Sequence, residues 1–164
     1  MLLEKIKSLA AQSAADNIQI RRHLHAHPEL SYQEFETCKY VQAQLKAIGI
    51  PFTVIATTGV LGIIEGKNPT KRVIALRADM DALPIVEENN IEYKSTKDGV
   101  MHACGHDVHT TILLGAAKIL WSLREEFEGT IKLLFQPGEE KNPGGASYMI
   151  RDGALLNPAP QGIV

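Results

Sequence analysis

The densest group of chemically useful side chains lies in residues 101–110, MHACGHDVHT. Cys104 and His106 stand two positions apart, so in an extended loop a thiolate and an imidazole turn toward the same ion. A sulfur and a nitrogen donor together suit zinc or a similar borderline metal. We expect Asp107 or His109 to hold the imidazole in place. The competing interpretation, a polar helix cap with Cys104 in the core, is disfavoured by the density of ligand-type side chains.

Two acidic pairs accompany this cluster. Glu139 and Glu140 follow the segment FQPG, and neighbouring glutamates on a turn diverge. One can therefore bind a metal while the other holds a proton, a division that suits metal-assisted hydrolysis. Asp79 and Asp81, in RADMDALP, are two apart and can together orient an imidazole or bind a cation. Either pair alone is more simply a solvated turn, and only the neighbouring Cys/His cluster favours chemistry.

The histidines at positions 23, 25 and 27 resemble a metal-binding ribbon but lie at the end of a predicted helix. Only His23 and His27 share a helix face, and an imidazolium is favourable near a helix C-terminus. We expect these histidines to be structural and to stay away from the metal site.

A cysteine hydrolase is the alternative enzyme class, with Cys104 as nucleophile and His106 or His109 as base. The Cys-Gly-His spacing instead places the two groups as ligands of one ion. Nothing in the sequence supplies a separate oxyanion hole, so this class is disfavoured.

The elements that must position these groups follow from hydrophobic periodicity. A helix is predicted from Leu2 to about His27, and a second from a capping box at Ser31 and Glu34 to Gly49. Residues 80–105 are mostly loop. The other predicted elements are strands at 52–55, 60–65, 73–77 and 131–135, a helix from Asp107 or Thr110, and a short helix at about 146–151. The Cys/His cluster and the two acidic pairs all follow predicted strands, where functional groups of α/β sheets gather. We expect a layered α/β fold with a mixed sheet, and strand 73–77 at the centre of that sheet.

Composition sets the broad class. The chain has 164 residues, 45% hydrophobic and 22% charged, with a net charge of −2, which suits one globular α/β domain without a basic surface for nucleic acid. The sequence has neither a signal peptide nor a run of about 18 apolar residues, so we expect no membrane partner. The two cysteines, Cys38 and Cys104, are too few for a disulfide framework, so we expect a reducing, cytoplasmic location.

Four motifs in order resemble one known family. They are RRHLHAHPE (21–29), RADMDALP (77–84), HACGHD (102–107) and FQPGEE (135–140). The sequence is similar along its whole length to the aminoacylase-like metallopeptidases, and within them to the amidohydrolase branch. That branch contains hippurate hydrolases, indole-acetyl-amino-acid hydrolases and N-acetyldiaminopimelate deacetylases.

The resemblance implies a role for each site residue. Cys104, His106 and Glu140 would bind metal, Glu139 would be the general base, and Asp81 would take a supporting catalytic role, with Asp79 as a less certain neighbour. It further implies two divalent metal ions, zinc or manganese, a homodimeric enzyme, and hydrolysis of an N-acyl-amino acid at its amide bond.

The resemblance also has a limit in length. Members are more than twice as long, and two further histidine ligands lie beyond the equivalent of Val164. We therefore expect residues 1–164 to be the N-terminal part of a zinc-peptidase-type catalytic domain, with the lid and dimerisation domain and the C-terminal catalytic part absent. The alternative is a truncated, non-catalytic remnant that folds and self-associates.

Overall fold

The computed structural model describes all of residues 1–164. Four strands form its central sheet: β1 Phe52–Ile55, β2 Gly59–Glu65, β3 Val73–Asp79 and β4 Thr130–Gln136. Their order in the sheet is β1-β2-β4-β3. The β1–β2 and β2–β4 pairs are antiparallel, whereas β3 and β4 run parallel. The predicted mixed sheet is confirmed.

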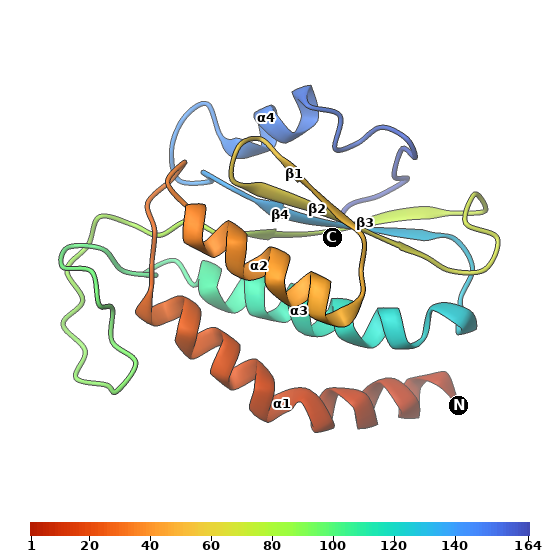
Figure 1. The fold of residues 1–164 in the computed structure, drawn as a ribbon, viewed down its shortest axis with the longest axis horizontal. Coiled ribbons are helices and arrows are strands. Elements are labelled where there is room, and N and C mark those ends of the chain that lie inside the picture. Colours follow the sequence, from red (N-terminus) through yellow and green to blue (C-terminus); the bar gives the residue numbers. More distant parts are fainter.

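Helices cover both faces of this sheet: α1 Leu2–Ala26, α2 Phe35–Ile48, α3 His106–Ser122 and α4 Gly145–Arg151, with a 3-10 turn, η1, at Arg124–Glu126. Figure 1 shows α2 and α3 against one face, with α1 packed outside α3, and α4 alone on the opposite face. No helix combines the length and the hydrophobicity that crossing a membrane would require. The layered α/β fold expected from the sequence is therefore present.

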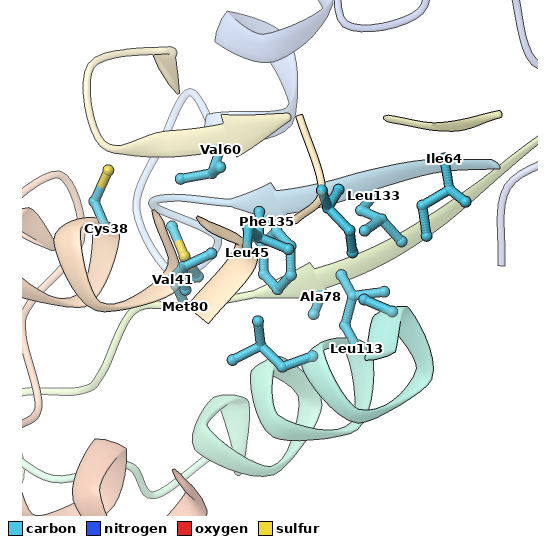
Figure 2. Close-up of a cluster of buried hydrophobic side chains, with 13 residues drawn as sticks. Cys38, Val41, Leu45, Val60, Ile64, Ala78, Met80, Leu113, Leu133 and Phe135 are labelled. Carbon is cyan, nitrogen blue, oxygen red and sulfur yellow. The ribbon is translucent and has the colours of Figure 1, made fainter. Parts of the chain in front are cut away.

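The main hydrophobic core lies between the sheet and helices α2 and α3 (Figure 2). Side chains alternate along a strand, so Leu133 and Phe135 of β4 enter this core, while Leu134 joins a smaller cluster beneath α4. Leu133 and Phe135 are fully buried, and each contributes about 1.5–3 kcal/mol to folding. This packing makes the sheet a rigid base for the loops at its edge.

The predicted capping box at the start of α2 is wrong. The helix begins at Phe35, its N-cap residue Glu34 makes no capping bond, and the Glu29 carboxylate accepts from the first-turn N–H of Thr37 at 2.8 Å instead. The Ser31 hydroxyl donates to Asp81 instead, and the Glu34 carboxylate accepts from Thr58 and from the backbone of Gly138. Tertiary partners have therefore taken the two side chains that the spacing assigned to a local cap.

β3 was expected at the centre of the sheet, and instead it is the last of the four strands. Its free side is nevertheless paired in part, because Ala75 forms a parallel bridge with Ile163. The Ala75 N–H donates to Gly162 at 3.0 Å, and the Val164 N–H donates to Ala75 at 3.0 Å. Backbone on both sides and helices on both faces explain why β3 is apolar on either face.

The parallel pairing of β3 and β4 decides where the site lies. Asp79 at the end of β3 is the register partner of Gln136 at the end of β4. The loops that follow these two strands therefore leave the sheet side by side. Helix α3 begins at the same edge with His106, so all three chemically active segments meet there.

Candidate metal centre

Cys104, His106 and Glu140 come together as the sequence predicted. One potential ligand atom from each lies within 4.8 Å of the other two. His106 is buried, whereas Cys104 and Glu140 reach the surface. The alternative that Cys104 lies in the core is therefore wrong.

Gly105 makes this geometry possible. Its φ of +86° lies in the left-handed region, which residues with a β carbon rarely adopt. The turn ends the loop and starts α3 at His106, so the Cys104 side chain stays outside the helix beside the His106 ring.

Asp81 fixes the orientation of the His106 imidazole. Nδ1 of the ring lies 2.9 Å from the Asp81 main-chain oxygen and 3.3 Å from Oδ1. A carbonyl oxygen only accepts, so Nδ1 carries a hydrogen and the neutral ring keeps its lone pair on Nε2. Nε2 faces Asp79 Oδ1 at 3.6 Å and Glu140 Oε1 at 3.8 Å. Burial lowers the pKa of His106, but the hydrogen bond to Asp81 and the Asp79 charge outweigh it and raise the pKa.

Asp81 also ties two other segments to the site. Its Oδ2 accepts from the Ser31 hydroxyl at 2.6 Å and from the Glu140 N–H at 3.0 Å. Burial raises the pKa of Asp81, but hydrogen bonds from His106, Ser31 and the Glu139–Glu140 backbone outweigh it and hold the pKa well below its usual range. Asp81 is thus an ionised, buried carboxylate that orients the groups around it.

Asp79 and His109 form a second set with His106 whose donor atoms also lie within 4.8 Å of one another. His109 Nδ1 is 2.7 Å from Asp79 Oδ1, and Arg77 pairs with the other Asp79 oxygen at 2.9 Å. The expectation that Asp107 or His109 holds the His106 ring is wrong. The expectation that the Asp79–Asp81 pair can orient an imidazole is confirmed for Asp81.

Asp107 binds the histidine segment of α1 instead. His25 is buried with Nδ1 2.7 Å from Asp107 Oδ2 and Nε2 3.0 Å from Glu87 Oε1, and Arg21 pairs with Asp107 at 2.9 Å. This link from α1 to the start of α3 was missed, because its partners are 82 residues apart. Only the Arg21–His25 spacing of one helical turn hinted at a shared face.

The histidines of α1 keep away from the metal donors, as predicted. Neither candidate set contains His23, His25 or His27. His23 and His27 share a face, with ring centroids 4.5 Å apart, and His23 stacks on Tyr40. Partial burial and the neighbouring charge of His27 lower the pKa of His23.

The electrostatics of the site suit a cation. The Glu140 carboxylate, followed by burial and the charges of Asp79 and Glu139, raises the pKa of the Cys104 thiol. A catalytic cysteine needs the opposite shift, so the cysteine-hydrolase alternative is not supported. Several acidic groups around one sulfur and one imidazole nitrogen match the donor set of a zinc-like ion.

Glu139 diverges from Glu140, as expected for neighbours on a turn. Glu140 joins Cys104 and His106, whereas Glu139 lines a cavity of about 410 Å³ on the α4 side of the sheet. Arg77 and Gln136 also line that cavity, and most of its other lining residues are apolar. A carboxylate is thus available beside the metal donors without being one of them.

The profile of peptidase family M20/M25/M40 matches residues 75–164, the segment that contains Asp81, Cys104, His106, Glu139 and Glu140. The chain belongs to this family. The resemblance inferred from the four motifs is confirmed.

Individual M20 relatives agree with this assignment. The N-acyl-L-amino acid amidohydrolase of Geobacillus stearothermophilus is 49% identical over 94% of this chain and 42% of that protein. The IAA-amino acid hydrolase ILR1-like 2 of Arabidopsis thaliana is 51% identical over 85% of this chain and 31% of that protein. The crystal structure of Bacillus subtilis YXEP, described as a dinuclear metal binding peptidase of the M20 family, superposes with a TM-score of 0.84 at 40% identity. The superposed region covers 96% of this chain and 42% of the YXEP chain.

This M20 chain therefore spans between 31% and 42% of the length of these relatives. Within it, sequence reasoning missed the contribution of residues 30–34, LSYQE, to the site. Ser31 contacts Asp81, while Tyr32 and Glu34 contact the loop that carries the two glutamates. The only signal was the Ser31–Glu34 spacing, which was interpreted as a helix cap.

Proposed function

We propose that residues 1–164 are the N-terminal part of the catalytic domain of a metal-dependent amidohydrolase that removes acyl groups from N-acyl-amino acids. The observation that carries the proposal is the convergence of Cys104, His106 and Glu140 in a chain of the M20 family, with Glu139 next to Glu140 in the same loop. We assign the first three residues as metal ligands and Glu139 as the general base. Asp81 supports them by orienting His106 and the Glu140 backbone.

The donor set fits a divalent ion such as zinc or manganese. Two donors are anionic when ionised, and His106 presents its Nε2 because Nδ1 is held by Asp81. A metal bound there supplies Lewis-acid activation of the amide carbonyl and of the attacking water. Glu139 takes the proton from that water and delivers it to the leaving amine, and so it must remain free of the metal.

The substrate class is supported by the relatives' names. One relative is named for N-acyl-L-amino acids and another for IAA-amino acids. Both names describe an acyl group on an amino acid, so we propose a small-molecule substrate of that kind.

A chimera tests this function, because the relatives are more than twice as long as the chain. Residues 1–164 replace the matching segment of the Geobacillus amidohydrolase, and hydrolysis of N-acetyl-, N-benzoyl- and indole-acetyl-amino acids is measured with zinc or manganese. We expect metal-dependent turnover. Glu139→Gln should lower kcat about 10²–10⁴-fold, because the amide cannot accept the proton.

Glu36→Gln serves as the matched control, since Glu36 is exposed on α2 and pairs only with Lys39. It should leave kcat unchanged. Turnover that survives Glu139→Gln would refute the general-base assignment. Failure of Cys104→Ser to weaken metal binding would refute the metal centre itself.

A further inference from the structure

The loop between β4 and α4 carries both glutamates of the site. Two internal hydrogen bonds close it, from Gly145 N–H to the Gly138 oxygen at 2.8 Å and from Gly144 N–H to the Lys141 oxygen at 2.9 Å. Neither bond joins the loop to the rest of the protein. Both exposed glutamates lie within the loop that the Gly138–Gly145 bond closes. The contacts that anchor this loop to the rest of the protein therefore decide where Glu140 meets Cys104 and His106.

Tyr32 contacts the loop on both sides of the glutamate pair. Its hydroxyl donates to the Lys141 oxygen at 2.7 Å and accepts from the Gly144 N–H at 3.1 Å. Its ring packs so closely on Gly138 that a β carbon there would lie 2.3 Å from the ring. Tyr32 itself has a φ of +66°, a conformation that residues with a β carbon rarely adopt. The surrounding contacts therefore hold the residue in an unfavourable backbone conformation against the loop.

Glu34 contacts the same loop from beneath. One carboxylate oxygen accepts from the Gly138 N–H at 2.7 Å and the other from the Thr58 hydroxyl at 2.8 Å. The residue is fully buried, and no ion pair compensates its charge. A buried carboxylate without a cation is costly, and the hydrogen bonds from Gly138 and Thr58 offset that cost while tying the glutamate loop to the segment before β2.

We propose that Tyr32 and Glu34 are positioning residues that hold the Glu139–Glu140 loop in its metal-binding geometry. The inference rests on the proposed function and assigns the LSYQE segment to it. Glu34 fixes the loop where it leaves β4, and Tyr32 fixes it where it approaches α4. Neither side chain is a ligand, so both act through Glu140.

The test is cobalt binding by the 164-residue chain. Cobalt(II) bound to a thiolate gives a charge-transfer absorption that reports Cys104, and its visible bands report the remaining ligands. We expect Tyr32→Phe and Glu34→Ala to weaken cobalt binding about 10-fold, the usual effect of removing partners that orient metal ligands. The charge-transfer band should persist, because Cys104 and His106 lie on the other segment. Glu34→Gln should restore most of the affinity, since its amide oxygen can accept from Gly138.

Controls separate positioning from general stability. Tyr40→Phe and Glu36→Gln alter the same residue types away from the loop and should bind cobalt as the wild type does. Thermal unfolding of each metal-free variant shows that it is folded at the titration temperature. Amide hydrogen exchange of Gly138 and Gly144 gives a metal-free measure of the loop, and it should accelerate in Glu34→Ala and Tyr32→Phe respectively.

The outcomes distinguish this inference from the proposed function. A folded Tyr32→Phe protein should bind cobalt more weakly than the wild type. A folded Glu34→Gln protein should bind cobalt more tightly than Glu34→Ala does. If both Tyr32→Phe and Glu34→Ala bind cobalt with wild-type affinity, the inference is overturned and the metal centre stands. If the wild-type chain binds no cobalt, the metal centre is overturned and the purpose assigned to Tyr32 and Glu34 falls with it.

Discussion

Buried carboxylates join distant segments of this protein at the level of single residues. Glu34, Asp81, Glu87 and Asp107 are each at most 3% exposed. Each accepts hydrogen bonds from another part of the chain, which offsets the cost of its burial. Such acceptors have fixed directions, so they specify how loops and helices meet around the site.

Glu87 allows a pH test of this principle. Burial alone raises the pKa of Glu87, but hydrogen bonds from the Ser95 N–H, His25 and Asn89 outweigh it and lower the pKa from 4.5 to about 2. A lowered carboxyl pKa stabilises the folded state above pH 4.5, and this contribution is lost as the pH falls from about 4.5 to about 2. We expect Glu87→Gln to cost about 2 kcal/mol at pH 6, with the gap narrowing below pH 4.5.

Urea unfolding of both proteins at several pH values measures this gap. Glu88→Gln is the control, because Glu88 is the exposed neighbour and should leave the gap to the wild type small and constant. If the loss of unfolding free energy in Glu87→Gln stays the same from pH 6 to pH 3.5, the carboxylate charge is not what stabilises this loop.

At the level of elements, the loops at the β3–β4 edge are placed by close backbone contacts. Gly145 starts α4 and closes the glutamate loop through its bond to Gly138. A β carbon at Gly145 would lie 1.7 Å from the Pro137 oxygen, a distance that no side chain can occupy. The contact leaves room only for glycine.

Gly145→Ala should therefore destabilise the fold by about 1–3 kcal/mol, as overpacking usually does, and displace Glu140. Gly162→Ala is the matched control, because a β carbon at Gly162 meets nothing within 4 Å. Urea unfolding and cobalt affinity measure the two effects. Equal stability and equal affinity in the two variants would show that the Pro137–Gly145 contact does not position the loop.

At the level of the whole molecule, the chain matches its relatives closely but covers only part of them. YXEP, a dinuclear protein, superposes on 96% of this chain, which is 42% of the YXEP chain. The two candidate donor sets here share His106, whose Nε2 faces both Asp79 and Glu140. One nitrogen lone pair binds only one ion, so His106 completes one set and leaves the other with two donors from these residues.

We therefore expect the 164-residue chain to bind one divalent ion weakly and to hydrolyse no N-acyl-amino acid by itself. A catalytic zinc site takes three protein ligands and a water, so Cys104, His106 and Glu140 suffice for one ion at most, whereas two metals that share a water need more ligands than these. Metal analysis after dialysis and an assay of N-acetyl-amino acids measure both quantities. Two tightly held ions per chain, or turnover abolished by Glu139→Gln, would contradict this expectation.

The sequence by itself predicted the elements and the candidate metal donors. Periodicity located every helix and strand, with ends that shift by a few residues, because alternation and helical spacing are local properties of the chain. Residue type and spacing selected Cys104 and His106 and one of the two neighbouring glutamates, since few side chains bind a zinc-like ion. The family resemblance assigned Glu140, and the fold brings these three residues together.

Only the tertiary structure decided how the donors are oriented. The sequence left the His106 ring to the Asp79–Asp81 pair or to Asp107 or His109, interpreted Ser31 and Glu34 as a helix cap, and placed β3 in the middle of the sheet. In the fold, Asp81 holds His106, Ser31 and Glu34 reach other segments, and β3 is the last of four strands. These contacts join residues 25 to 104 positions apart, and a hydrogen bond between such distant residues leaves no periodic trace in the sequence.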